Sequence, residues 1–170
     1  LLDEDNQLLG ETYGYRDSRT QGMDELVYQR VPEAELYAIT GIQKQPFNTI
    51  YQLMAVKQHH PEYLKQAKTF LMLPDYFHFL LTGKMVQEYT NATSTQLVNV
   101  RTKEWDRDIL ERLGYPEELF EALAMPGTEV GRLTKEIEQE VGYSCQVVLP
   151  ATHDTGSAVL AVPDRKSTRL

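Results

Sequence analysis

The 170-residue chain has little of what marks secreted, membrane-spanning or nucleic-acid-binding proteins. It has one cysteine, Cys145, so it can form no internal disulfide, which fits a reducing compartment. No apolar run approaches the ~20 residues that span a bilayer, and no signal-peptide pattern is recognisable. Basic residues number 17 against 25 acidic ones, and the net charge of −8 argues against nucleic acid or an anionic membrane as the main partner. We therefore expect a cytoplasmic protein.

The composition is that of an ordinary globular protein. Hydrophobic residues make up 41% and charged residues 25%, and the length suits one domain or part of a larger one. Both ends look interrupted, because residues 1–3 read as the end of a strand and residues 164–170 turn abruptly basic and polar. We expect a fragment whose domain covers residues 1–163, with residues 164–170 as a tail outside the family pattern.

Apolar spacing predicts several short helices between short strands. Each of four glycines follows a predicted helix, at the position where glycine commonly ends one. Asn48 and Asp106 are expected to cap the helices that follow them, and Cys145 to be a small buried residue rather than a nucleophile. This mixture predicts an α/β domain with a helical lobe. The helices are expected at 23–31, 32–39, 49–59, 73–82, 107–113, 117–123, 133–141 and 154–162, and the strands at 1–3, 8–15, 70–72 and 147–149.

Two polar stretches suggest the functional site. Residues 146–159 form an apolar β-branched run, a proline, a His-Asp pair and a series of small residues suited to opening a helix. Asp154 would then lie at a strand-to-helix turn, where a helix N-terminus favours a negative charge, and carboxylates placed in this way serve as general bases. Residues 88–95 are similarly dense in polar groups. Together the two stretches predict a site that binds a polyhydroxy substrate and removes a proton from it.

The chain resembles the FGGY carbohydrate kinases, and within that family the bacterial rhamnulokinases. Any single block is weak, but the ordered set covers about residues 1–163. The stretch 88–97 and His153-Asp154-Thr155 suit the whole family, whereas the blocks at 41–43 and 46–53 resemble the rhamnulokinases in particular. The other blocks of the resemblance are residues 15–20, 73–76 and 81–84.

The resemblance implies a partial ribonuclease-H-like (actin-like) fold, in which two domains enclose a cleft with ATP on one side and sugar on the other. It implies ATP with Mg²⁺ as cofactors and transfer of the γ-phosphate to the C1 hydroxyl of L-rhamnulose, giving L-rhamnulose 1-phosphate. The family's phosphate-binding turn and its adenosine-binding domain have no counterpart in this chain. We therefore expect the isolated chain to be inactive, and its ATP-binding residues stay unassigned.

The resemblance assigns Asp154 as the catalytic base, which orients the sugar hydroxyl and accepts its proton. His153 would donate a hydrogen bond to the sugar, and Tyr89 would line the polyol site. Each has a structural alternative: Asp154 could cap a helix beginning at Thr155, His153 could be satisfied by backbone, and Tyr89 could be a strand aromatic. Asp17 could approach the sugar or form an ion pair with Arg19 that ties its loop.

Two other functions remain open at this stage. The first is an FGGY kinase for another ketose or polyol: xylulose, fuculose, ribulose or glycerol. The second is a sugar-binding module without catalysis. For Gln43 and Asn48, in the blocks that resemble the rhamnulokinases, loop and capping roles are favoured over a role in sugar specificity.

Overall fold

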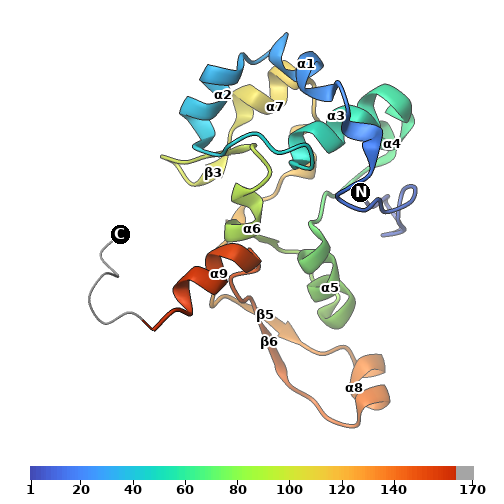
Figure 1. Ribbon diagram of the computed structural model, residues 1–170. Coiled ribbons are helices and arrows are strands. Elements are labelled where there is room, and N and C mark those ends of the chain that lie inside the picture. The colour runs from blue at the N-terminus through green and yellow to red at the C-terminus, as the bar shows by residue number, and fades with distance from the viewer. Residues whose placement is uncertain (164–170) are drawn as a thin grey trace.

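The computed structural model describes residues 1–163, in which a lobe of helices lies above a narrower part that contains an antiparallel pair of strands joined through a short helix (Figure 1). Its strands pair two by two, β1 with β4 in parallel, and β2 with β3 and β5 with β6 antiparallel. The helices are α1 Met23–Tyr28, α2 Glu33–Thr40, α3 Thr49–His59, α4 Pro61–Gln66, α5 Leu73–Thr82, α6 Tyr89–Thr93, α7 Arg107–Leu113, α8 Lys135–Val141 and α9 Asp154–Leu160, with 3₁₀ turns η1 Ser18–Thr20 and η2 Glu117–Leu119. The strands are β1 Gln87–Glu88, β2 Val98–Asn99, β3 Glu104–Trp105, β4 Leu123–Ala124, β5 Glu129–Arg132 and β6 Gln146–Val148.

The helical lobe is built around one apolar core. Helices α1, α2, α3 and α7 turn their apolar faces inward, and removing this surface from water is the main force that holds them together. Tyr115 is buried among them, and its hydroxyl donates to the Ile50 carbonyl at 2.7 Å. The core residues of these four helices are Val27, Leu36, Ile50, Tyr51, Leu53, Met54, Ile109, Leu110 and Leu113.

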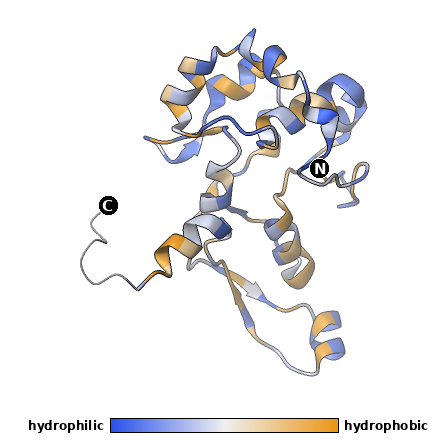
Figure 2. Ribbon diagram, in the orientation of Figure 1, coloured by the Kyte–Doolittle hydropathy of each residue, from blue (hydrophilic) through white to orange (hydrophobic). Residues whose placement is uncertain are grey.

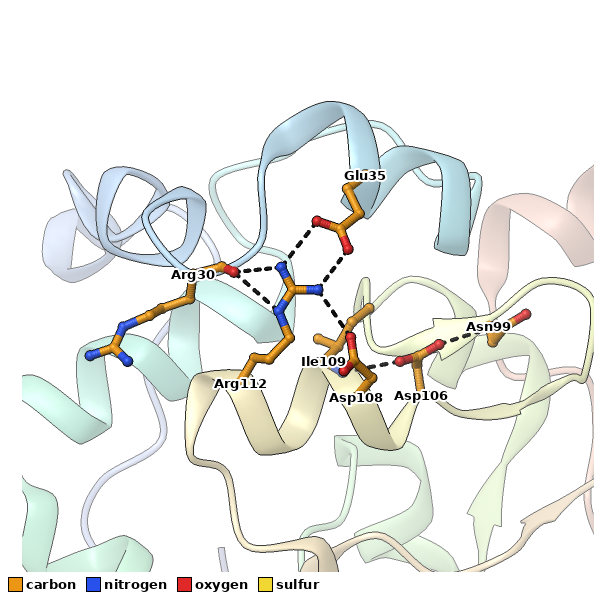
Figure 3. Close-up of polar contacts among 7 residues, drawn as sticks. All are labelled: Arg30, Glu35, Asn99, Asp106, Asp108, Ile109 and Arg112. Atoms are coloured by element: carbon orange, nitrogen blue, oxygen red, sulfur yellow. Dashed lines mark hydrogen bonds and ion pairs between the residues drawn. The ribbon is translucent and has the colours of Figure 1, made fainter.

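An arginine fastens three segments of this lobe together (Figure 3). Arg112, on α7, donates to both carboxylate oxygens of Glu35 on α2, at 2.6 and 3.0 Å, and to Asp108 one turn earlier at 3.0 Å. It also donates to the carbonyl of Arg30, just after α1, at 2.6 and 3.1 Å. A two-pronged pair of this kind fixes orientation as well as distance.

The ends of several helices follow the predicted signals. Gly41, Gly83, Gly114 and Gly142 all end helices in the left-handed conformation. At Gly114 the φ angle is +64°, which disfavours any residue with a Cβ. Asp106 caps α7 as expected, because its carboxylate accepts the Ile109 N–H at 3.0 Å (Figure 3).

Several expectations about local structure are wrong. Residues 70–72 form no strand; Phe70 instead packs edge-on to Trp105, where buried aromatic area outweighs strand pairing. The segment 117–123 is a 3₁₀ turn leading into β4, and the segments at 1–3 and 8–15 pair through single bridges only. These stretches are short, so long-range contacts decide their conformation. Cys145 is exposed, since it lies in the open loop before β6.

Asn48 occupies the cap position of α3 but does not cap it. Its amide donates to the Ser94 carbonyl at 2.6 Å, and its side-chain oxygen accepts the Gln45 N–H, also at 2.6 Å. The buried Asn48 side chain therefore joins its own loop to the loop after α6. Because the contact with Ser94 joins residues 46 positions apart, spacing alone did not predict it.

The narrower part of the molecule leaves apolar surface exposed. Helix α5 has the predicted apolar spacing, yet Leu73 and Phe77 are 56% and 55% exposed, and Leu160 at the end of α9 is 81% exposed. Figure 2 shows this hydrophobic colouring on α5 and on the second half of α9. Within residues 1–163, no helix is long and apolar enough to cross a membrane.

Candidate functional site

The two polar stretches identified from the sequence meet at the buried carboxylate of Glu88. This residue ends β1 and is inaccessible to solvent. Its Oε1 accepts the Thr90 N–H at 2.7 Å, and its Oε2 accepts the Asn91 N–H at 3.0 Å, so it caps α6. Oε2 also accepts the N–H and the hydroxyl of Thr152, at 3.2 and 2.6 Å. One carboxylate thus joins chain segments that are 64 residues apart.

The Thr90 hydroxyl extends this connection. It donates to Glu88 Oε2 at 2.6 Å and accepts the His153 N–H at 3.2 Å. We call Glu88, Thr90, Asn91 and Thr152 the Glu88 network. It holds the chain just before Asp154 against the chain that begins at Tyr89.

The electrostatics of this network depend on a second buried carboxyl group. Burial by itself would raise the pKa of Glu88, but hydrogen bonds from Thr152 and Thr90 outweigh it, and the pKa lies below its ordinary value. Asp75, on α5, accepts the Glu88 N–H at 3.2 Å, and its other oxygen has no partner within residues 1–163. Burial and the nearby Glu88 charge raise the pKa of Asp75 to about 7. Below about pH 7, the negative charge of the pair therefore resides mainly on Glu88.

Asp154 is the first residue of α9 and is exposed. Its Oδ1 accepts the Thr155 N–H at 2.7 Å and the Thr155 hydroxyl at 3.3 Å, and no hydrogen bond to its Oδ2 is present within residues 1–163. The alternative in which Asp154 caps this helix is wrong, because His153 occupies the cap position. An exposed carboxylate in the first turn of a helix can accept a proton from a ligand.

His153 caps α9 through its ring. Nδ1 accepts the Gly156 N–H at 3.2 Å, a geometry that requires an unprotonated Nδ1 and assigns the ring proton to Nε2. A backbone N–H thus satisfies one of the two ring nitrogens, in agreement with the structural alternative for His153. Its Nε2–H is still a donor suited to a hydroxyl oxygen.

Tyr89 and Asp17 occupy different surroundings. Tyr89 is half-buried, begins α6 and packs partly against the core, so its description as a strand aromatic is wrong. Asp17 caps η1 by accepting the Arg19 N–H at 2.8 Å, and no hydrogen bond within residues 1–163 joins it to Tyr89, His153 or Asp154. The alternative, an ion pair between Asp17 and Arg19, is not present in the described part of the chain; the Arg19 guanidinium donates to Gln52 at 2.7 Å and stacks on Tyr13 at 4.0 Å.

Sequence reasoning included Glu88 and Asp75 in its motifs but gave them no role. A local signal existed for Glu88, since an acidic residue before Thr90-Asn91 suits a helix cap. Nothing local indicated Thr152 as its partner. A cavity of about 440 Å³ lies apart from these residues, between β3, η2 and β4, and is lined in part by Trp105 and Phe120.

Comparison with known proteins gives the family. Residues 1–161 match the FGGY family of carbohydrate kinases, N-terminal domain. The chain is 56% identical over 163 residues to a rhamnulokinase of Halalkalibacterium halodurans, which covers 96% of this chain and 35% of the relative. It is 51% identical over 168 residues to a rhamnulokinase of Oceanobacillus iheyensis, which covers 99% and 36%. The chain thus spans about a third of the length of these relatives.

A solved structure supports the same assignment. A ligand-bound xylulose kinase from Lactobacillus acidophilus has a TM-score of 0.80 with 26% identity, over 88% of this chain and 31% of that one. The expected fold, a partial ribonuclease-H-like α/β domain with a helical lobe, is confirmed, as is the resemblance to the rhamnulokinases. The chain belongs to the FGGY family of carbohydrate kinases.

Proposed function

We propose that the full-length protein is an ATP-dependent sugar kinase that phosphorylates the C1 hydroxyl of L-rhamnulose, giving L-rhamnulose 1-phosphate. The observation that carries this proposal is the 56% identity to a rhamnulokinase across 96% of the chain. The 163 aligned residues span the stretches on which the candidate site is built. The protein would act in the cytoplasm, on a small sugar, with neither nucleic acid nor membrane as a partner.

In this proposal the chain supplies the sugar side of the reaction. The C1 oxygen attacks the γ-phosphorus, the bond to the ADP oxygen breaks, and Asp154 takes the hydroxyl proton. Phosphoryl transfer depends mostly on positioning and electrostatic stabilisation, so the main task of Asp154 is to orient the hydroxyl. The Nε2–H of His153 would donate to a sugar oxygen, and Tyr89 would line the site. The position of Asp17 favours its structural role as the cap of η1.

ATP and Mg²⁺ are implied for the whole protein by its family. Within residues 1–163, no three His, Cys, Asp or Glu side chains are grouped so that they could hold a metal ion. We therefore assign no ligand for ATP or Mg²⁺ to the described residues and derive no step through the metal ion. The proposed domain covers residues 1–163; residues 164–170, expected to be a foreign tail, lie outside the described residues.

The identity of the sugar is tested with the full-length protein. Phosphorylation of L-rhamnulose is measured beside L-fuculose, xylulose, ribulose and glycerol, with ADP release and the position of the new phosphate as readouts. A clear preference in kcat/KM for L-rhamnulose, with phosphate on C1, supports the proposal. A preference for another sugar supports the proposed sugar-kinase activity and rejects L-rhamnulose as its substrate.

One observation favours a second candidate, a kinase for another ketose. One of the solved structures with a TM-score of 0.80 is that of a xylulose kinase. Its 26% identity is far lower than the identity to the rhamnulokinases, so we rank it second. Binding of a sugar without turnover of any in the panel would indicate the non-catalytic sugar-binding module instead.

A further inference from the structure

We propose that Glu88 is a positioning residue for the phosphoryl transfer, which sets the location of Asp154 relative to Tyr89 without touching the substrate. This inference rests on the proposed function, because that function makes Asp154 the base. Glu88 is inaccessible to solvent and already accepts bonds from Thr90, Asn91 and Thr152. A carboxylate in that situation has no access to a sugar, so any effect on catalysis must pass through its neighbours.

The geometry links Tyr89 and Asp154 to the carboxylate of Glu88. Tyr89 follows Glu88 directly and begins the helix that Glu88 caps. Thr152 lies two residues before Asp154, and both its N–H and its hydroxyl point to Glu88 Oε2. The His153 N–H is held in turn by the Thr90 hydroxyl. The backbone leading into α9 is therefore fixed at consecutive residues against the start of α6.

Chemistry explains why an ionised carboxylate suits this place. Every group that hydrogen-bonds to the Glu88 carboxylate donates, and hydrogen bonds to a charged acceptor are shorter and stronger than neutral ones. Glutamine would present an NH₂ group to donors of Thr90 or Thr152 and leave some unpaired in a buried site. A shift of about 1 Å at a reacting group can cost a hundredfold in rate, so loss of this connection would lower turnover through the position of Asp154.

The sharpest test removes one hydroxyl from the network in the full-length protein. Thr152→Val keeps the side-chain shape and the backbone N–H but loses the hydroxyl bond to Glu88, whereas Thr152→Ser keeps the hydroxyl. We expect Thr152→Val to lower kcat for the sugar about ten- to hundredfold with the KM for ATP unchanged, and Thr152→Ser to restore most of the rate. Thr128→Val is the matched control, since within residues 1–163 its hydroxyl bonds only the Met125 carbonyl, in the turn before β5.

A second readout separates this inference from the proposed function. Hydrogen exchange at the amides of Thr152 and His153 should accelerate in Thr152→Val and in Glu88→Gln, and stay slow in Thr152→Ser. If the wild type phosphorylates no sugar, the proposed function fails and exchange alone decides whether the network holds this segment. The inference is overturned if exchange is unchanged, or if Thr152→Val merely lowers the melting temperature while kcat per folded molecule stays at the wild-type value.

Discussion

Individual residues at the candidate site divide between those that face solvent and those that hold them in place. Asp154 is exposed, with one carboxylate oxygen occupied by Thr155, whereas Glu88 and Asp75 are fully buried within β1 and α5. Exposure suits a base that meets a substrate, and burial suits groups that set a geometry. Two predictions follow from this difference.

Asp154→Asn in the full-length protein should abolish turnover while sparing sugar binding. The amide keeps the size of the side chain and can hydrogen-bond to a hydroxyl, but it cannot accept the proton. We expect kcat to fall by ~10²–10⁴-fold, with the dissociation constant for the sugar within a few-fold of the wild-type value. Steady-state kinetics and calorimetric titration measure the two quantities. Near-normal turnover in the variant would remove Asp154 from its assigned role.

Asp75→Asn should raise the free energy of unfolding, and more so at higher pH. The folded pKa of Asp75 is about 7 and its ordinary value is 3.8, so the folded state favours the protonated acid. In the wild-type protein, the contribution of Asp75 to the free energy of unfolding is fully present below about pH 4 and is lost as the pH rises through about 7. Asparagine does not ionise and still offers an oxygen to the Glu88 N–H.

The size of this effect is limited by the pKa shift. Each pKa unit corresponds to about 1.4 kcal/mol. The difference in the free energy of unfolding between Asp75→Asn and the wild type can therefore grow by at most roughly 4 kcal/mol as the pH rises. Urea unfolding at several values between pH 4 and 8 measures it. An advantage that does not change with pH would show that Asp75 is already ionised in the folded protein.

Single elements differ in how much of the fold depends on them. Helix α7 contributes Ile109, Leu110 and Leu113 to the core and carries Arg112, whereas α8 has no buried residue. Both helices begin with a capping side chain, Asp106 at 3.0 Å from the Ile109 N and Thr134 at 3.4 Å from the Ile137 N. The same local interaction therefore serves a central helix in one case and a peripheral helix in the other.

Asp106→Ala should cost about 1 kcal/mol or somewhat more in the free energy of unfolding. The substitution removes the cap of α7 and also the bond from the Asn99 side chain at 3.0 Å. Thr134→Ala is the matched control and should cost less in global unfolding, since α8 can fray alone. Denaturant unfolding compares the two, with Asp106→Ser expected to recover part of the loss. Equal costs would mean that both helices unfold with the core.

The whole molecule exposes apolar surface that an isolated soluble domain would normally cover. Leu73, Phe77 and Leu80 on α5 and Leu160 on α9 are about half exposed or more. Leu73, Phe77 and Leu80 share one face of α5 by their i, i+4, i+7 spacing, and exposed apolar patches of this kind mark interaction surfaces or sites of aggregation. The chain also spans only about a third of the length of its rhamnulokinase relatives.

The isolated 170-residue chain should therefore self-associate, bind a hydrophobic dye and show no sugar-dependent ATP turnover. Replacing Phe77 and Leu80 with Gln should reduce the dye signal and the apparent mass in light scattering. Tyr143→Gln serves as the control, because Tyr143 is 62% exposed at a loop and scattered exposed side chains are ordinary. A monodisperse chain without dye binding contradicts the first expectation, and sugar-dependent turnover contradicts the second.

The sequence by itself determined the features that depend on near neighbours. Helices α2, α3, α5 and α7 were predicted because apolar spacing, the Asp106 cap and the glycines that end α2, α5 and α7 act within a few residues. The family followed from ordered motifs, and the candidate base from a His-Asp pair after a strand. Such signals need no knowledge of the tertiary structure.

Only the tertiary structure decided which distant groups meet. It paired Glu88 with Thr152, joined Asn48 to Ser94, turned Arg19 to Gln52 and left the apolar face of α5 exposed. It gave the cap of α9 to His153 rather than to Asp154. These outcomes depend on competition between hydrogen-bond partners far apart in the chain. Where a polar side chain has several possible partners, the local sequence does not indicate which of them it will bond.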